Sequence, residues 1–369
     1  MEGRDRKITV SLVNRYLYRM SKFCSLLLIA LGISNSIIAQ NTQTYAERLG
    51  YPSGTKVVIF HVDDAGMSYE SNTGTIRSIE EGVATSCSIM MPCPWSAAFT
   101  KYALTEPMDA GVHLTLTSEW GSYRWHPVAG RELVPTLIDE EGALWHSVQE
   151  VVENASPDEI EIEIRAQIDR AMAMGLKPTH LDSHMGTLFY HAPFMERYIK
   201  VGAEYGIPVM FPGGTNLKLL GLSMNENVIK RLKKEGKYTA GMELPKNELM
   251  IQAPSIGQKI WSLGLPVLDD LHSVSGNWKP DGDPTPEEWG KYKTEQFKEV
   301  LTEMEPGLAM IIVHSNGDNE VFGRISGSGG SRYADMLAMV DPELKSFIEK
   351  EGILLTTWNE VMERRKAVK

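Results

Sequence analysis

Cysteine is scarce in this sequence: the chain has three cysteines in 369 residues, at positions 24, 87 and 93. A small protein held together by disulfide bonds needs a larger, paired set, so the sequence excludes a disulfide framework. Cys87 lies in an expected strand and Cys93 just after its end, and the two could either form a disulfide bond or be two small buried side chains. With 42% hydrophobic and 23% charged residues, the chain has the composition of a globular protein with its own core.

Positive charge is also in short supply. Residues 1–39 carry six basic and two acidic side chains, so the rest of the chain has 31 basic against 46 acidic residues, a net charge of −15. That part contains no long run of lysine and arginine, whereas binding to nucleic acid or to an anionic membrane requires a basic surface. We therefore expect no nucleic acid and no membrane surface among the partners.

A membrane-spanning run is lacking as well. The apolar stretch after Lys22 has about ten residues, fewer than the roughly 20 that a membrane helix needs, so no membrane insertion is expected. A lysine before this stretch and small residues after it are typical of a secretory signal peptide over residues 20–39, cleaved near Ala39. Residues 1–19 would then be an upstream extension, and residues 40–55 a linker. We expect an exported protein, periplasmic or secreted.

In the rest of the chain, short apolar runs alternate with helix-length segments. Expected strands are 56–62, 85–91, 111–117, 179–183, 208–211, 266–271, 308–313 and 353–357. Expected helices are 72–81, 157–174, 286–304 and 342–350. Longer regions without periodicity are 118–155, 212–246, 273–284 and 317–331, the last with a flexible loop at 327–330. About eight alternating units predict an α/β protein with a parallel sheet, as a single-domain, irregular (β/α) barrel similar to a TIM barrel; a doubly wound open sheet is the alternative.

Carboxylates and imidazoles collect at the expected carboxyl ends of these strands, where (β/α) barrels build their active sites. In chain order they are Asp63, Asp64, His113, His180, Asp182, His184, Asp269, Asp270, His272 and His314. Two adjacent carboxylates at the end of a buried strand are costly unless a cation offsets their charge. Two histidines and one carboxylate around a divalent cation leave positions open for water and substrate, as in hydrolytic metal sites. A second carboxylate could then act as the base and a further histidine as the acid.

Two questions stay open at this point. His180 and His184 are both candidates for the metal, because residues an even number of positions apart share one face of a strand. The pair Asp269 and Asp270, with His272, offers an alternative or second metal site.

Four stretches, in the order HVDDAG, GVHLTLT, THLDSH and IIVHSNG, resemble the motifs of YdjC-type carbohydrate deacetylases. The loop RWHPV…VPTLIDEEGALW and the late arginine in SRYADML are also similar. The resemblance implies a deacetylase domain over residues 56–366 with a distorted (β/α) barrel. It also implies a metal-dependent hydrolase that removes acetyl groups from N-acetylated amino sugars or oligosaccharides.

Carried over position by position, the resemblance implies that Asp64, His113 and His184 bind one divalent metal ion, with Zn²⁺ and Mg²⁺ as the first choices. Asp63 would be the catalytic base, and His314 the acid or a partner of the oxyanion.

Contacts to a carbohydrate substrate are expected from Trp125, Arg332 and His180. Arg332 could instead orient the acidic and imidazole groups, and Trp125 could cover the barrel mouth without touching the sugar. Two other activities remain as alternatives: a glycoside hydrolase on a similar barrel, which needs two opposed carboxylates and no metal, and a sugar-binding protein without catalysis.

Overall fold

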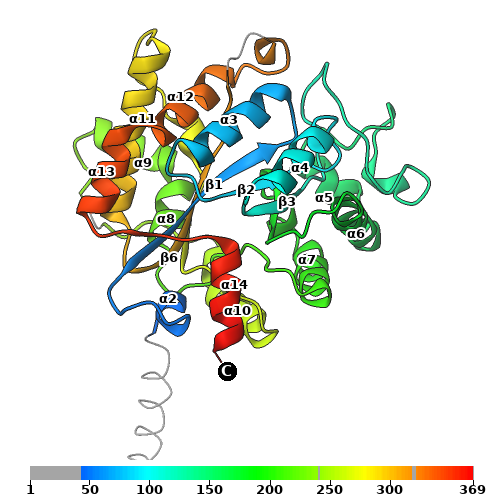
Figure 1. Cartoon of the computed structure of the whole chain (residues 1–369), viewed down its shortest axis with the longest axis horizontal. Helices are drawn as coiled ribbons and strands as arrows, with labels where there is room; N and C mark the ends of the chain where they lie inside the picture. The colour runs from blue at the N-terminus through cyan, green and yellow to red at the C-terminus, as the bar shows by residue number, and fades with distance from the viewer. Residues whose placement is uncertain (1–42, 240–241, 318–320, 369) are drawn as a thin grey trace, which may run out of the picture. The chain divides into compact units, whose positions relative to one another are not determined.

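The structure is a computed structural model that describes residues 43–239, 242–317 and 321–368 (Figure 1). Residues from Thr44 to the C-terminus form one compact unit. The expected extension at 1–19 and signal peptide at 20–39 lie outside the described residues. Within the described ranges, no helix combines the length and the apolar character that crossing a membrane would require.

The described residues form a parallel sheet of seven strands around the long central strand β1 (Figure 1). The strands are β1 (Lys56–Ala65), β2 (Ser86–Ile89), β3 (Ala110–Leu114), β4 (Leu181–Ser183), β5 (Asp270–His272), β6 (Gly307–Val313) and β7 (Leu354–Leu355). Their order is β4-β3-β2-β1-β6-β5, and β7 pairs with the first half of β1. The side chains of β1 from Val57 onward are buried, as expected for a parallel strand covered on both faces.

The two edges of this sheet are joined by the expected strand at 208–211, which is reduced to isolated bridges. Leu181 of β4 pairs with Val209, and Pro212 pairs with Leu268 just before β5, both in parallel. Proline has no N–H to donate, so Pro208 and Pro212 limit this segment to a few sheet hydrogen bonds. The pairing nevertheless returns from β4 to β5, which confirms an irregular (β/α) barrel.

Helices pack outside the sheet. They are α2 (Tyr45–Arg48), α3 (Tyr69–Glu80), α4 (Ser96–Thr105), α5 (Val148–Asn154), α6 (Pro157–Ala173), α7 (Ala192–Tyr205), α8 (Lys218–Met224), α9 (Glu226–Lys234), α10 (Glu248–Ser262), α11 (Pro286–Glu303), α12 (Gly329–Met339), α13 (Pro342–Lys350) and α14 (Trp358–Ala367). Short 3-10 turns are Pro135–Leu137, His184–Phe189, Ser275–Asn277 and Phe322–Arg324. The starts of α6, α11 and α13 follow the expected pattern, with a capping side chain and proline in the first turn.

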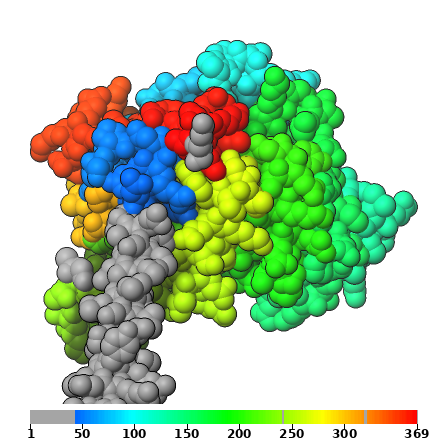
Figure 2. Space-filling view, turned by 90° about the horizontal axis from the view of Figure 1, so that it is seen from below, coloured from blue at the N-terminus to red at the C-terminus, as the bar shows by residue number. Residues whose placement is uncertain are grey.

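One face of the unit gathers α2, α10 and α14, which lie side by side in Figure 2 (blue, yellow and red). Arg48 and Arg365 lie over the ring of Trp261 at 4.1 and 4.0 Å. The carboxylate of Asp269 accepts the N–H groups of Tyr45 and Ala46 at 2.7 and 3.0 Å. Residues 45–48 of the segment expected to be a linker at 40–55 are thus packed against the barrel.

Two expectations about loops are wrong. Region 212–246 contains the helices α8 and α9, and the segment expected to be a flexible loop at 327–330 includes the start of α12. Gly330 lets α12 approach α11 closely, because a Cβ atom there would come within 2.9 Å of the Trp289 ring. Cys87 and Cys93 are both buried and free, so the alternative of two small core side chains is the correct one.

Candidate metal centre

The end of β1 brings two neighbouring carboxylates, Asp63 and Asp64, to one place. In a regular strand, neighbouring side chains point to opposite faces of the sheet. Here the pairing of β1 with β2 shifts register between Val62 and Ala65, and Asp64 has a positive φ of 67°. Because of this irregularity both carboxylates reach Nε2 of His113, Asp63 Oδ2 at 3.8 Å and Asp64 Oδ1 at 3.3 Å.

Three side chains form a triangle of ligand atoms at this point. Asp64 Oδ1 lies 3.3 Å from His113 Nε2 and 3.2 Å from His184 Nδ1, and the two nitrogens are 3.2 Å apart. Ligands held about 2.1 Å from one ion are about 3.0–3.4 Å from one another, so the triangle has the size that a divalent cation requires. All three side chains are buried, and Asp64 Oδ1 has no hydrogen-bond partner in the described part of the chain. These residues therefore fit a metal ion.

Carboxylates behind the two imidazoles set their orientation. Asp182 Oδ1 lies 2.8 Å from His113 Nδ1, and Glu119 Oε1 lies 3.1 Å from His184 Nε2. A proton on each of these outer nitrogens leaves the lone pair of the inner nitrogen directed at the centre, as in metal sites where a carboxylate supports the histidine. Glu119 has no role in the sequence-based prediction, because it follows β3 by several residues in an irregular segment.

Charges around the candidate metal centre shift the pKa values of two of its side chains. Burial alone would raise the pKa of Asp64, but Arg332 and the neighbouring imidazoles hold it well below its usual range. Arg332 donates through Nη1 to Asp64 Oδ2 at 2.7 Å, which leaves Oδ1 facing the two imidazoles. Burial would lower the pKa of His184, whereas Glu119 and Asp64 raise it to about 9. Arg332 comes from α12 and thus contacts the proposed ligand directly; a contact to substrate stays a prediction.

Asp63 and His314 stand beside the triangle without belonging to it. Nε2 of His314, which follows β6, is 3.8 Å from Asp63 Oδ2. The His314 side chain is 27% exposed, against 9% for Asp63 and 1% for Asp64, so it faces the mouth of the barrel. Burial and the charge of Arg332 lower the pKa of His314, which favours a neutral imidazole at neutral pH.

A buried ion pair supports the position of His314. Asp335 Oδ2 accepts the backbone N–H of His314 at 3.0 Å and the hydroxyl of Ser275 at 3.0 Å. Its other oxygen, Oδ1, is 2.7 Å from Nζ of Lys293, and both side chains are fully buried. Lys293 also donates to the carbonyl and the hydroxyl of Ser331. The pair thus connects α11 and α12 to the end of β6.

Removing this lysine should destabilise the fold strongly. In Lys293→Met the Asp335 carboxylate would stay buried without its counter-charge, and we expect a loss of about 3–5 kcal/mol in the free energy of unfolding. Chemical denaturation would measure it. Lys298→Met on the same helix is the control: its ion pairs with Glu295 and Glu343 lie at the surface, so the loss should stay below about 1 kcal/mol. Equal losses in both variants would contradict the prediction.

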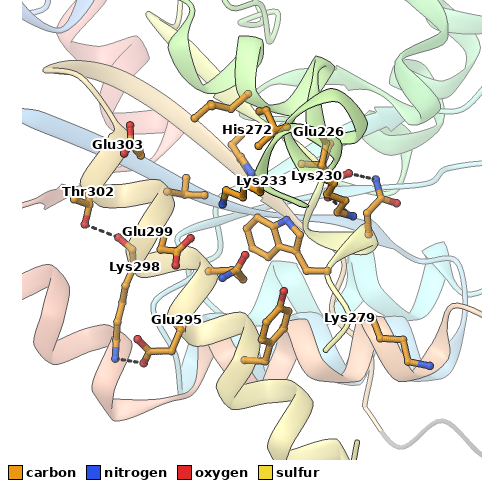
Figure 3. Close-up of a pocket in the computed structure, with 18 of the residues that line it drawn as sticks. Glu226, Lys230, Lys233, His272, Lys279, Glu295, Lys298, Glu299, Thr302 and Glu303 are labelled. Carbon is orange, nitrogen blue, oxygen red and sulfur yellow. Dashed lines mark hydrogen bonds and ion pairs between the residues drawn. The ribbon is translucent and has the colours of Figure 1, made fainter. Parts of the chain in front are cut away.

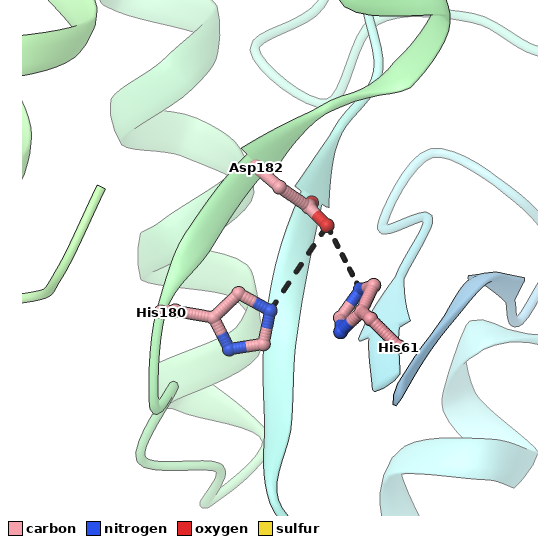
Figure 4. Close-up of side chains that lie close together, drawn as sticks. All are labelled: His61, His180 and Asp182. Atoms are coloured by element: carbon pink, nitrogen blue, oxygen red, sulfur yellow. Dashed lines mark ion pairs between the residues drawn. The ribbon is translucent and has the colours of Figure 1, made fainter. Parts of the chain in front are cut away.

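His180 belongs to a second group behind the triangle, with His61 and Asp182 (Figure 4). It is fully buried, its ring stacks on Trp358 with centroids 5.2 Å apart, and its Nε2 is 4.0 Å from Asp182 Oδ2. Gly111 makes room for it, since a Cβ atom there would lie 2.5 Å from the imidazole. The structure therefore brings His184, and not His180, to Asp64 and His113, and it places His180 away from solvent.

Trp125 belongs to the loop after β3 and is buried. Its indole N–H donates to the carbonyl of Thr117 at 2.8 Å, and only 2% of the residue is exposed. Its ring centroid is 6.4 Å from that of His184. Its predicted contact with a sugar stays a prediction, and Trp120 and Tyr123, which pack on Trp125, are only partly buried.

The alternative metal site of Asp269, Asp270 and His272 is not assembled, and the two acids lie at or just before the start of β5. Asp269 accepts backbone N–H groups of α2 and of Leu308, and Asp270 accepts those of Leu219 and Leu220 at the start of α8. Both carboxylates thus anchor backbone, which explains two adjacent acids there without a metal. Among the described residues, no group of three candidate ligands includes them or His272.

His272 instead lines a cavity of about 560 Å³ on the outside of the barrel, next to α9 and α11 (Figure 3). The cavity shares no residue with the metal centre. Its charged lining mixes both signs, including Lys230, Lys233, Lys298, Glu226, Glu295 and Glu299. Lys230 pairs with Glu226 and Lys298 with Glu295, so the lining largely neutralises itself and points to no class of ligand.

The support of His113 by Asp182 can be tested through metal affinity. In Asp182→Asn the charge behind His113 is lost, and affinity for Zn²⁺, measured by isothermal titration calorimetry, should fall about 10–100-fold. Asp109→Asn is the control, because Asp109 is also a largely buried acid but bonds to Ser86 and Thr179, and its imidazole neighbour at 3.9 Å is His180, which lies outside the triangle. Wild-type affinity in Asp182→Asn would contradict this role.

Comparison with known proteins places this arrangement in context. A carbohydrate deacetylase of Thermus thermophilus is 34% identical over 166 residues, which cover 45% of this chain and 57% of that protein. A carbohydrate deacetylase of Thermoanaerobacter pseudethanolicus is 24% identical over 305 residues, 82% of this chain and 98% of that protein. The alignment with the Thermus protein thus spans less than two thirds of its length.

The fold is also found in a solved structure. A candidate cellobiose-phosphate cleavage protein of Enterococcus faecalis superposes with a TM-score of 0.62 at 20% identity, covering 83% of this chain and 99% of that one. Residues 57–350, most of the chain and within the predicted domain, match the family described as YdjC-like protein. The chain therefore belongs to the YdjC-like family.

Proposed function

We propose that this protein is an exported, divalent-metal-dependent hydrolase that removes acetyl groups from N-acetylated amino sugars or oligosaccharides. One observation carries the proposal: Asp64, His113 and His184 form a buried triangle of metal size, and a further carboxylate, Asp63, stands beside it. The names of the two carbohydrate deacetylases agree with it.

Each side chain at the candidate metal centre has a separate role in the proposed reaction. Asp64, His113 and His184 would hold the cation, which supplies Lewis-acid polarisation of a carbonyl oxygen and acidifies water. Asp63 lies next to this position and is placed to take a proton from the attacking water.

The leaving nitrogen also needs a proton. His314 is neutral at neutral pH by the argument above, so it has to acquire a proton during the reaction, and Asp63 at 3.8 Å is placed to supply it. His314 then faces the mouth of the barrel, where the leaving amine would lie. Arg332 keeps Asp64 ionised and fixed throughout.

A release assay tests the function. Acetate would be measured over a panel of N-acetylated mono- and oligosaccharides, with wild-type protein, with chelator, and after return of Zn²⁺, Mg²⁺, Mn²⁺ or Co²⁺. We expect acetate release that is lost with chelator and restored by metal. Release of reducing ends without acetate, insensitive to chelator, would instead select a glycoside hydrolase, and sugar binding without turnover by the metal-loaded protein would select a binding protein.

Export is tested separately. Expression of the full chain in a Gram-negative host, followed by fractionation and N-terminal sequencing, should give a periplasmic or secreted protein that begins near Gln40. An uncleaved chain in the cytoplasmic fraction would refute this part of the proposal and leave the activity unaffected.

A further inference from the structure

His61 is a buried histidine that the assignment of ligands, base and acid does not use. It lies on β1 two residues before Asp63, so both side chains start from the same face of the strand. Its Nε2 lies 3.2 Å from Asp63 Oδ1, 3.0 Å from Asp182 Oδ2 and 3.0 Å from the hydroxyl oxygen of Ser88. Its Nδ1 lies 3.1 Å from the hydroxyl oxygen of Ser86.

The hydrogen bonds around His61 define the protonation state of its imidazole. The Ser86 hydroxyl donates its one proton to Asp109 at 2.6 Å, and the Ser88 hydroxyl donates to Asp182 at 2.8 Å. Towards His61 both hydroxyl oxygens therefore offer lone pairs, as the carboxylates do. Both nitrogens of His61 thus meet only acceptors and both must carry protons, so His61 is an imidazolium.

The electrostatics agree with this result. Burial would lower the pKa of His61, but its contacts with Asp182 and Asp63 raise it to about 9. The neighbouring imidazole of His180, with centroids 4.9 Å apart, has its pKa lowered by burial and by His61, and is the neutral one of the two.

We propose that His61 is a positioning residue whose Nε2 edge holds the carboxylate of Asp63 beside the metal centre and ties it to Asp182. This inference rests on the proposed role of Asp63 as base. Asp182 in turn orients His113, so one imidazolium sets the distance between the base and a metal ligand. Asp63 Oδ1 accepts no hydrogen bond of good geometry among the described residues, and its contact is the ion pair with His61 at 3.2 Å, whereas Oδ2 lies at a looser 3.8 Å from His113 and His314.

Two substitutions test the roles of the two ring nitrogens of His61 separately. The amide nitrogen of glutamine reaches the place of Nε2, which faces Asp63, whereas that of asparagine reaches the place of Nδ1, which faces Ser86. His61→Phe keeps a ring and removes both nitrogens. If His61 positions Asp63, glutamine should restore activity and asparagine should not. If the role of His61 is limited to its bond with Ser86, asparagine should restore activity instead. If its role is limited to packing, phenylalanine should be tolerated.

The control is His180→Phe. His180 is equally buried and lies near the same Asp182, but none of its nitrogens reaches Asp63. If the loss of any buried imidazole lowered activity, His61→Phe and His180→Phe would be affected alike.

The experiment measures kcat and KM for acetate release from tri-N-acetylchitotriose, together with bound Zn²⁺, in all four variants. We expect kcat to fall about 100-fold in His61→Phe and His61→Asn, as for a misplaced catalytic group, and to stay within about tenfold of wild type in His61→Gln. KM, bound zinc and His180→Phe should stay near wild type. Equal kcat in the three His61 variants, or loss of zinc in all of them, would overturn the inference.

Crystal structures of the same variants give a readout that needs no substrate. The Asp63 carboxylate should keep its place in His61→Gln and rotate away in His61→Phe; an unmoved carboxylate in His61→Phe would also overturn the inference. If Asp63→Asn is fully active, the proposed base is wrong. If Asp63→Asn is inactive and His61→Phe behaves like wild type, only the positioning role is wrong.

Discussion

Asp63→Asn should reduce acetate release by about 10²–10⁴-fold while the protein binds its metal as the wild type does. The amide cannot accept the proton from the attacking water, and a general base contributes about 10²–10⁴-fold to such a reaction. Asp63 is outside the triangle of ligand atoms, so the metal site itself is unchanged. The measurement is kcat for acetate release together with zinc content by mass spectrometry.

The matched control is Asp169→Asn on α6, since Asp169 is an acid whose only described hydrogen bond is from the Tyr205 hydroxyl, at 2.8 Å on the surface. Its turnover should equal that of wild type. If Asp63→Asn retained more than a tenth of the wild-type rate, Asp63 would not be the base.

His184→Ala should abolish stable metal binding, and His180→Ala should not. Removal of one of three protein ligands costs more than loss of a supporting carboxylate, so we expect the affinity for Zn²⁺ to fall by well over about 100-fold. Dialysis against buffer without metal, followed by a zinc assay, distinguishes the two variants. Asp64→Ala should behave like His184→Ala.

The two histidines make this a decisive comparison, because they come from the same short stretch, THLDSH, and are both buried. The opposite result, with zinc retained in His184→Ala and lost in His180→Ala, would assign the metal site to the group formed by His61, His180 and Asp182. The alternation of residues along a strand could not decide between them, since both positions face the same side.

Much of the barrel could be predicted from the sequence because its strands are short apolar runs closed by polar residues. The expected strand 56–62 lies within β1, and the expected strand 308–313 matches β6 except for the first residue of β6. Prediction failed where helices are short, as in α8 with seven residues and α9 with nine, and where glycines serve close packing, as at the start of α12. In both cases contacts with other elements decide the structure.

The centre was predictable to a similar extent. Residues at strand ends converge in any barrel, so Asp63, Asp64, His113, His184 and His314 could be collected without coordinates. The partners behind them could not, because the role of Glu119 depends on how an irregular segment folds back over His184. His61 carried a usable signal, its position two residues before Asp63 on the same strand.

The bond between Arg332 and Asp64 joins positions 268 residues apart. During synthesis, the chain therefore has β1, His113 and His184 complete long before the arginine that compensates Asp64 has left the ribosome. Contacts of such high sequence separation form late, because a long loop must first be closed. A nascent chain that stops before α12 would therefore carry Asp64, His113 and His184 but lack the arginine that compensates the charge of Asp64.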